Sequence, residues 1–112
     1  MATSDRVRED GLLTVRTEED GDALLVRATG EVDVSTSGTL ESELRRAIGC
    51  NCSIIFLDLS AVNFIDSAGF RAFFLAAKHS HLNGKPLRMT PVSAPVKRTI
   101  DRLDLWDSLP LD

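Results

Sequence analysis

The sequence has few of the features that mark membrane-spanning or secreted proteins. Its 112 residues include only two cysteines, Cys50 and Cys52, which lie two positions apart, so we expect no structural disulfide. A membrane-spanning helix needs about 20 apolar residues, and the apolar runs of this sequence are far shorter. Residues 1–10 contain no apolar stretch of the kind found in a secretory signal. We therefore expect a cytoplasmic protein with no membrane partner.

An excess of positive charge is also missing. The chain has 13 Lys and Arg against 17 Asp and Glu, which gives a formal net charge of −4. Its basic residues are scattered apart from the pair Lys97-Arg98. Proteins that bind nucleic acid need clustered basic residues to displace counterions from phosphates. We therefore expect no nucleic-acid partner.

The remaining composition is typical of one globular domain. Hydrophobic residues make up 43% of the chain and charged residues 27%. At this length, folding buries more than about 60% of the surface of the unfolded chain, so stability requires no cofactor. We expect a flexible tail at residues 1–10, which are charged and aperiodic, and a single domain at 11–112.

The first half of that domain reads as a hairpin followed by a helix. Strands are predicted at 12–17 and 23–29, joined by a turn at Asp20-Gly21. The cluster Ser35-Thr-Ser37 offers N-caps for a helix that ends at Gly49. Its apolar stripe consists of Leu40, Leu44, Ala47 and Ile48.

The second half alternates strands and helices. Residues 53–59 are apolar at almost every position, as expected of a strand covered on both faces. A helix is predicted from Ser67 to Leu82, then a strand at 87–90, then a helix capped by Ser93 with one apolar face. That face carries Val96, Ile100 and Leu103, and we expect residues 105–111 to fold back onto the core.

The predicted order is β-β-α-β-α-β-α. This is an α/β fold with an N-terminal hairpin and a mixed, mostly parallel sheet of four to five strands with helices packed on it. Partner sites of such sheets gather at the carboxyl ends of the strands. Two polar loops leave that edge, one containing Asp33 and the other running from Asp58 to Gly69. We expect the carboxylates of Asp33, Asp58 and Asp66 to lie near Ser67.

The second loop leads into a helix start. Asp66 is a natural N-cap, and Ile65 and Phe70 flank it at the spacing of a hydrophobic staple. Ser67 and Gly69 then fall in the first turn, where backbone N–H groups lack partners and the helix dipole is positive. A phosphate on Ser67 would add about −1.5 to −2 charges at a position that favours anions.

Gly69 breaks a local rule, because glycine inside a helix costs about 1 kcal/mol relative to alanine. Two interpretations remain open. The missing side chain lets another protein approach Ser67 closely, or it relieves packing beneath the preceding loop. In the second case Ser67 is an ordinary first-turn serine.

The segment Phe64-Ile-Asp-Ser-Ala-Gly-Phe70, preceded by Asp58-Leu-Ser60, resembles the signature of the STAS family, the sulphate transporter and anti-sigma factor antagonist domains. Flanking segments match more weakly, and the resemblance covers about residues 12–111. These flanking matches are Gly30-Glu-Val-Asp33, Gly84-Lys-Pro-Leu87, Val96-Lys-Arg98 and Leu103 to Trp106.

The resemblance implies a stress-response switch in bacterial transcription. In antagonists of this type, the unphosphorylated protein binds an anti-sigma factor that is itself a serine kinase, which frees a sigma factor. Phosphorylation ends the binding, and a serine phosphatase restores it. Carried over to this chain, Ser67 is the implied phosphorylation site. The implied partner-binding residues around it are Asp33, Asp58, Phe64, Ile65, Asp66, Ala68, Gly69 and Phe70.

Two positions depart from the commonest pattern of that family. Ala68 stands where many members have Ser or Thr, which leaves Ser67 as the one hydroxyl of the motif. Phe70 stands where many have Leu, which puts the identity of the partner in doubt. We expect Phe64, Ile65 and Phe70 to form an apolar patch beside Ser67, of the kind that marks a binding site.

Other functions fit the sequence less well. An esterase needs a histidine near Ser67, but His79 and His81 lie about 18–21 Å further along the same helix, and Gly-x-Ser-x-Gly is missing. We therefore expect no enzymatic activity. Cys50 and Cys52 could join these histidines in a zinc site, but histidines two apart on a helix point to nearly opposite sides, so we expect no metal.

A scaffold subunit of a larger STAS signalling assembly is the alternative function. A stable large homo-assembly in gel filtration would favour the scaffold, whereas a monomer or weak dimer would favour the antagonist.

Overall fold

The computed structural model describes residues 5–89 and 92–104. The elements are, in chain order, β1 (Arg6–Asp10), β2 (Leu13–Asp20), β3 (Ala23–Val32), α1 (Ser37–Ile48), β4 (Ile54–Ile65), α2 (Ser67–Leu82), β5 (Leu87–Met89) and α3 (Ala94–Leu103). Helix α2 has the predicted bounds. The expected fold-back of residues 105–111 lies outside the described residues.

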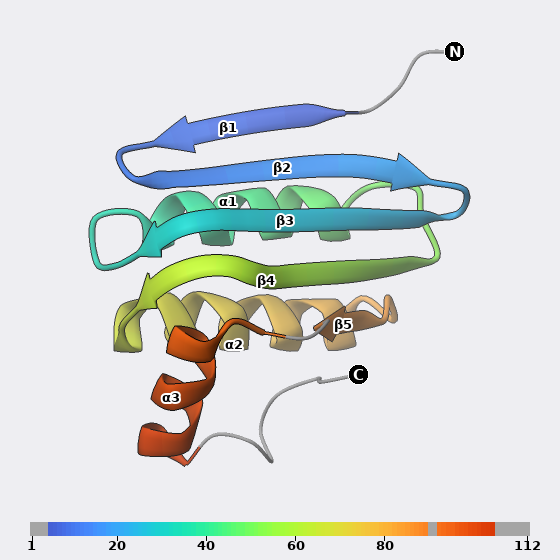
Figure 1. The fold of residues 1–112 in the computed structure, drawn as a ribbon. Helices are drawn as coiled ribbons and strands as arrows, with labels where there is room; N and C mark the ends of the chain where they lie inside the picture. Colours follow the sequence, from blue (N-terminus) through green and yellow to red (C-terminus); the bar gives the residue numbers. More distant parts are fainter. Residues whose placement is uncertain (1–4, 90–91, 105–112) are drawn as a thin grey trace.

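Within the described residues, five strands form one mixed sheet in the order β1-β2-β3-β4-β5 (Figure 1). Strand β2 pairs antiparallel with β1 and with β3, whereas β4 pairs parallel with β3 and with β5. The predicted hairpin and mixed sheet are confirmed, with parallel pairing confined to the last three strands. Among the same residues, no helix combines the length and apolarity that crossing a membrane requires.

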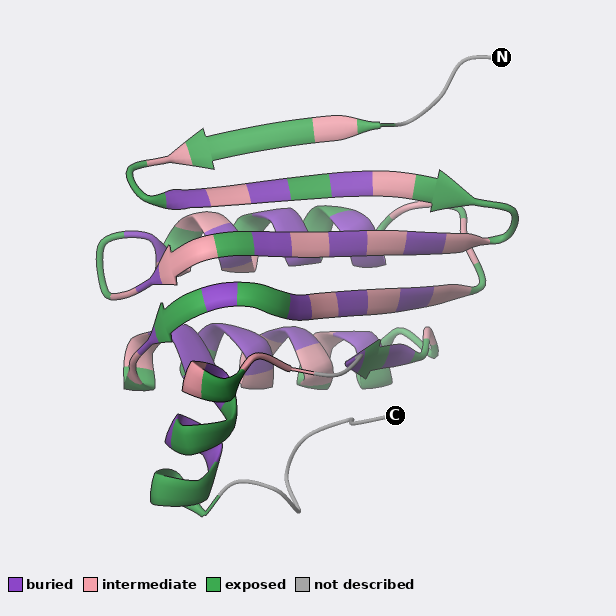
Figure 2. Ribbon diagram, viewed as in Figure 1, coloured by how far each residue is buried: buried purple, intermediate pink, exposed green. Residues whose placement is uncertain are grey.

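The core lies between the sheet and its helices (Figure 2). Helices α1 and α2 pack against each other, and α3 packs against β4. Alternate residues of β2, β3 and β4 are buried, and so is the predicted stripe of α1. The expectation that β4 is covered on both faces is wrong, because Ile54 and Phe56, on the other face, are only half-buried.

The expected flexible tail at residues 1–10 needs a correction from Arg6 onward, while residues 1–4 lie outside the described residues. Arg6–Asp10 form β1, which pairs along its length with β2. The side chain of Arg6 donates to Glu43 of α1 at 2.9 Å, and Thr39 of α1 donates to Asp10 at 2.5 Å. The strand was not recognised in the sequence because most of its side chains are charged and most are exposed, while Arg6 and Asp10 bond to α1.

Gly30 allows the end of β3 to approach the backbone of the turn between β1 and β2 closely. Its φ is +103°, and the next residue, Glu31, donates its N–H to the carbonyl of Leu12 at 3.1 Å. The pairing of β3 with β4 also shifts register between Gly30 and Glu31. A Cβ atom on Gly30 would lie 1.9 Å from the carbonyl oxygen of Leu12. Only glycine fits here without moving a strand.

We predict that Gly30→Ala lowers the free energy of unfolding by about 3 kcal/mol or more, because both the backbone conformation and the contact with Leu12 are unfavourable. Urea unfolding followed by circular dichroism measures the change. Gly38→Ala is the matched control, because a Cβ on Gly38, inside α1, meets no atom within 4 Å. The control should be neutral or stabilising by up to about 1 kcal/mol. Equal stability of the two variants would contradict this account of Gly30.

Candidate functional site

Helix α2 begins as its sequence predicts. Asp66 is its N-cap in extended conformation, and the Oδ1 atom of Asp66 accepts the N–H of Gly69 at 3.0 Å. The carbonyl of Asp66 accepts the N–H of Phe70 at 3.1 Å, so the first turn is closed. Ser67, the first helical residue, is exposed. Its hydroxyl therefore stands in solvent at the positive end of the helix dipole.

The end of β3 lies next to this helix start. Val32 pairs with Ile65, and the N–H of Asp66 donates to the carbonyl of Val32 at 3.2 Å. Asp33 follows Val32 directly, so the loop that it begins shares the sheet edge with Asp66 and Ser67. The expected proximity of these two carboxylate-bearing loops is confirmed by the strand register.

The carboxylate of Asp33 organises its own loop. It accepts hydrogen bonds from the hydroxyl of Ser35 at 2.6 Å and from the N–H of Ser35 at 2.9 Å, and it also accepts from Thr36. These bonds hold the pKa of Asp33 below its usual value. Thr36 occupies the predicted N-cap position of α1, but its side chain does not cap the helix. Asp33 therefore remains ionised and fixed in this loop.

Asp58 lies elsewhere, and the expectation that it flanks Ser67 is wrong. Strand β4 does not end near Leu59 but continues to Ile65, which separates Asp58 from the helix start by roughly 20 Å of strand. Its carboxylate accepts from Arg27 of β3 at 3.0 Å and from the N–H of Ser60 at 2.9 Å. Burial acts to raise the pKa of Asp58, but these bonds outweigh it and lower the pKa. Asp58 therefore stabilises the pairing of two strands.

The expected apolar patch is also only partly present. Phe64 is 45% exposed, but Ile65 and Phe70 are 3% and 1% exposed and belong to the core. The two buried side chains anchor the helix start, as a hydrophobic staple does, instead of reaching a partner. Phe64 points outward because it alternates with Ile65 along the strand.

Gly69 is buried and tightly packed. A Cβ atom at this position would lie 2.7 Å from Cγ1 of Ile65, 2.9 Å from Cγ1 of Val32 and 3.0 Å from the carbonyl oxygen of Val32. This geometry decides between the two interpretations of Gly69. Its missing side chain lets α2 pack onto the ends of β3 and β4, and it does not open the surface beside Ser67.

The structure adds exposed apolar residues that the sequence analysis did not identify. Leu12, in the turn between β1 and β2, is 69% exposed, and Val34, in the loop between β3 and α1, is 79% exposed. Figure 1 shows both connections at the end of the sheet where α2 begins. Leu12 is linked through Glu31 to Phe64, because Glu31 donates to the carbonyl of Leu12 and pairs with Phe64. The sequence did contain a signal for this exposure. Leu12 follows the turn residue Gly11, and Val34 lies beside the Ser/Thr cluster Ser35-Thr-Ser37, so neither belongs to a regular apolar pattern.

A groove of about 510 Å³ begins at Ser67 and runs between α2 and α3. Its lining residues are Ser67, Phe70, Arg71, Phe74, Leu75 and Leu103. Apart from Ser67 and Phe70, none of them was singled out for the site from the sequence. Leu103 was predicted to face the core with Val96 and Ile100, which are fully buried, but it is 40% exposed.

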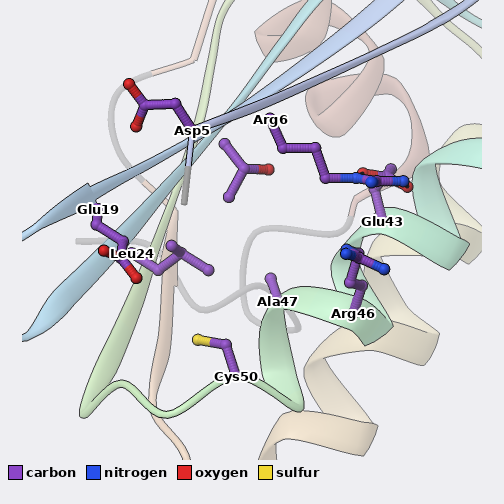
Figure 3. A pocket seen from close by; sticks show the side chains of 9 residues that line it. Asp5, Arg6, Glu19, Leu24, Glu43, Arg46, Ala47 and Cys50 are labelled. Carbon is purple, nitrogen blue, oxygen red and sulfur yellow. Dashed lines mark hydrogen bonds and ion pairs between the residues drawn. The ribbon is translucent and has the colours of Figure 1, made fainter. Parts of the chain in front are cut away.

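The opposite end of the sheet holds a cavity of about 560 Å³ between α1 and the first strands (Figure 3). It contains Cys50, whose pKa is raised to about 11, chiefly by burial. That thiol is protonated at neutral pH and is therefore a weak nucleophile. Cys50 and Cys52 are both free thiols. Across residues 5–89 and 92–104, no three His, Cys, Asp or Glu side chains gather as a metal ion would require.

Comparison with known proteins identifies relatives along almost the whole chain. The sequence model described as the STAS domain matches residues 14–112. An anti-sigma F factor antagonist from Paenibacillus polymyxa is 29% identical over 100 residues, which span 88% of this chain and 86% of the relative.

Two solved structures show the same fold. An anti-sigma factor antagonist from Mycobacterium paratuberculosis is similar with a TM-score of 0.73 and 26% identity, covering 88% of this chain and 84% of that one. The Bacillus cell fate determinant SpoIIAA in its phosphorylated form has a TM-score of 0.64 at 14% identity, covering 88% of this chain and 90% of its own. At this low identity, the second structure supports the fold alone.

We predict that Gly69→Ala destabilises the protein by about 1–3 kcal/mol, because a methyl group overpacks the contact with Val32 and Ile65. Alanine would stabilise an isolated helix at this position, so the sign of the change distinguishes tertiary packing from helix propensity. Thermal unfolding measures it. If the Gly69→Ala protein were more stable than the wild-type protein, α2 would not pack against β3 as closely as described.

Proposed function

The chain belongs to the STAS domain family, and we propose that it is an anti-sigma factor antagonist controlled by phosphorylation of Ser67. The unphosphorylated chain binds an anti-sigma factor that is also a serine kinase, and it thereby releases a sigma factor in the cytoplasm. The kinase then phosphorylates Ser67 and ends the complex, and a phosphatase reverses the modification. The chain itself performs no catalysis in this cycle.

The observation that carries the proposal is the exposed hydroxyl of Ser67 within the motif Asp66-Ser-Ala-Gly69 at the start of α2. A kinase must reach this oxygen, and nothing in the first turn obstructs it. The proposal is supported by the relatives from Paenibacillus polymyxa and Mycobacterium paratuberculosis, which are both described as anti-sigma factor antagonists.

The surface around Ser67 combines apolar and acidic residues. Phe64, Val34 and Leu12 supply exposed apolar surface at this end of the sheet, while Asp33 and Asp66 supply negative charge. A partner that covers this end removes the serine hydroxyl from water, which is tolerable for a small neutral group. A phosphate dianion in the same contact costs several kcal/mol unless cations are supplied. Because 1.4 kcal/mol changes an affinity tenfold, one phosphate is enough to dissociate the complex.

Within the chain, by contrast, the phosphate is well tolerated. Ser67 lies at the positive end of the dipole of α2, where the first N–H groups of the helix favour an anion. Ser67 is exposed, so its phosphate stays hydrated. We therefore expect the modification to change binding without unfolding the protein.

We predict that Ser67→Ala binds the anti-sigma factor kinase at least as tightly as the wild-type chain and cannot be phosphorylated. Ser67→Asp should bind at least about tenfold more weakly, because it places a permanent charge in the contact. The kinase is identified as the protein that co-purifies with Ser67→Ala from the source cells and phosphorylates the wild-type chain. Its affinities are then measured by calorimetry with purified proteins.

Ser42→Ala and Ser42→Asp serve as controls, because Ser42 is an exposed serine of α1. Both should bind as the wild-type chain does. Equal affinity of the wild-type, Ser67→Ala and Ser67→Asp chains for the kinase would refute the switch.

We also predict that the protein isolated from its own cells carries a single phosphate under some growth conditions. Intact-mass analysis detects it, and fragmentation should place it on Ser67. A population in which Ser67 is unmodified under all conditions, including those that change sigma factor activity, contradicts the proposal.

A further inference from the structure

Helix α2 carries apolar residues beyond those that it buries against the sheet and α1. Its core-facing side is fully buried and consists of Gly69, Phe70, Ala72, Phe73, Ala76 and Ser80. Phe74 and Leu75 form a second apolar stripe beside it and are only half-buried, although Phe74 also packs against the edge of the core. A helix at a protein surface normally carries one apolar stripe and polar residues opposite it. The additional stripe therefore leaves apolar surface that a partner could cover.

This second stripe forms one wall of the groove between α2 and α3. Leu103 of α3, 40% exposed, contributes to the other wall. Among the described lining residues, Arg71 carries the one charged side chain, and it is exposed. The groove therefore offers apolar walls, a guanidinium group, and at its end the hydroxyl of Ser67. A protein segment with an apolar side chain next to a carboxylate complements these three features.

Arg71 has no acidic neighbour on its own helix. The positions three and four residues before and after it are those at which helical side chains meet, and they hold Ala68, Ser67, Phe74 and Leu75. Helix α2 as a whole contains no Asp or Glu between Ser67 and Leu82. The four ion pairs between described residues do not include Arg71 either. The guanidinium group is therefore available to an external carboxylate until Ser67 itself becomes an anion.

We propose that the groove binds an apolar side chain of the partner kinase together with an adjacent carboxylate that pairs with Arg71. We further propose that phosphorylated Ser67 takes Arg71 away from that carboxylate. This inference rests on the function proposed above. A phosphate on Ser67 and the guanidinium of Arg71 stand in the i, i+4 arrangement with the acidic group nearer the N-terminus, which is the favourable order. Arginine and phosphate form strong charge-assisted hydrogen bonds.

The modification then acts twice on the complex. It places a dianion in the contact, and it also removes the cation that the partner's carboxylate needs. The carboxylate of Asp66 is less well placed for Arg71, because it lies five positions before Arg71 and not at the three- or four-residue spacing at which helical side chains meet.

The intramolecular pair can be tested without any partner. The full chain is produced with phosphoserine incorporated at position 67, and the phosphate is titrated by ³¹P NMR. Arg71 should stabilise the dianion, so Arg71→Gln should raise the second pKa of the phosphate. The matched control Lys78→Gln removes one positive charge from the same helix outside the groove and should leave this pKa unchanged. Equal pKa values in the wild-type and Arg71→Gln chains would overturn the pairing.

The groove is tested with the purified kinase and the unphosphorylated chain. Leu103→Ala and Arg71→Gln should each weaken binding about tenfold or more, and Arg71→Lys should retain part of the affinity. Leu82→Ala is the control, because Leu82 is an equally apolar residue of α2, 71% exposed, that does not line the groove. Thermal unfolding checks that the variants remain folded. Leu103→Ala binding as tightly as Leu82→Ala would overturn the assignment.

A photo-crosslinking residue in place of Leu75 identifies the occupant directly. Crosslinks to the kinase support the proposal. Crosslinks only to residues 105–112 of the same chain, or to a second copy, would overturn it. The two proposals remain separable: a wild-type chain that never binds a kinase defeats the proposed function, whereas normal switching in Arg71→Gln and Leu103→Ala defeats the groove alone.

Discussion

The functional end of the molecule depends on the close approach of α2 to the end of β3. The backbone carbonyl of Val32 lies so near Gly69 that a Cβ atom there would be 3.0 Å away, and the same carbonyl accepts the N–H of Asp66. This contact fixes where the helix begins. Asp66 is held both by β3 and by its own capping bond, and the residue that follows it, Ser67, is exposed. The exposure of one hydroxyl is thus a consequence of packing beneath it.

This arrangement explains why the motif combines residues with opposite roles in four consecutive positions. Asp66 and Gly69 serve the fold: one caps the helix, and the other lets the helix approach the sheet. Ser67 and Ala68 lie on the outer side of the same turn, where the structure places fewer demands on them. A sequence pattern that looks like a single functional signature is therefore half structural, and its structural half fixes the position of the serine that we propose as the phosphorylation site.

Much of the fold could be predicted from the sequence, because local rules and tertiary packing agree for most elements. The bounds of α2 follow from the cap at Asp66 and the stop after Leu82, and the strand register of the hairpin follows from alternation around Gly21. The predictions failed where tertiary contacts decided the outcome. Strand β1 is a charged segment stabilised by backbone pairing and by Glu43, and β4 continues through a polar stretch because the end of β3 pairs with it.

For the candidate site, the sequence predicted which loops lie together better than it predicted which side chains are exposed. Ser67, Asp66 and Asp33 lie together as expected, since parallel strands bring their carboxyl ends to one edge. Ile65 and Phe70 could not be told from exposed residues, because apolar character alone does not say which side of a helix start faces the core. Phe74 and Leu75 carried a readable signal, namely apolar positions on α2 beyond its one buried stripe. Arg71 carried a different signal, because it is a basic residue in a helix without acidic residues.

The proposed switch does not depend only on repulsion between the phosphate and the partner. The position of Arg71 on α2 relative to Ser67 adds a second effect. A helix without acidic residues leaves the side chain of Arg71 unpaired within its own turns, which is unfavourable for stability but leaves the cation available to a partner. Placing the modifiable serine four residues earlier makes the phosphate the first intrahelical anion within reach. The phosphorylated chain then gains the local pairing that the unmodified helix lacks. The same interaction that weakens the complex therefore stabilises the released protein, so both sides of the equilibrium shift toward dissociation.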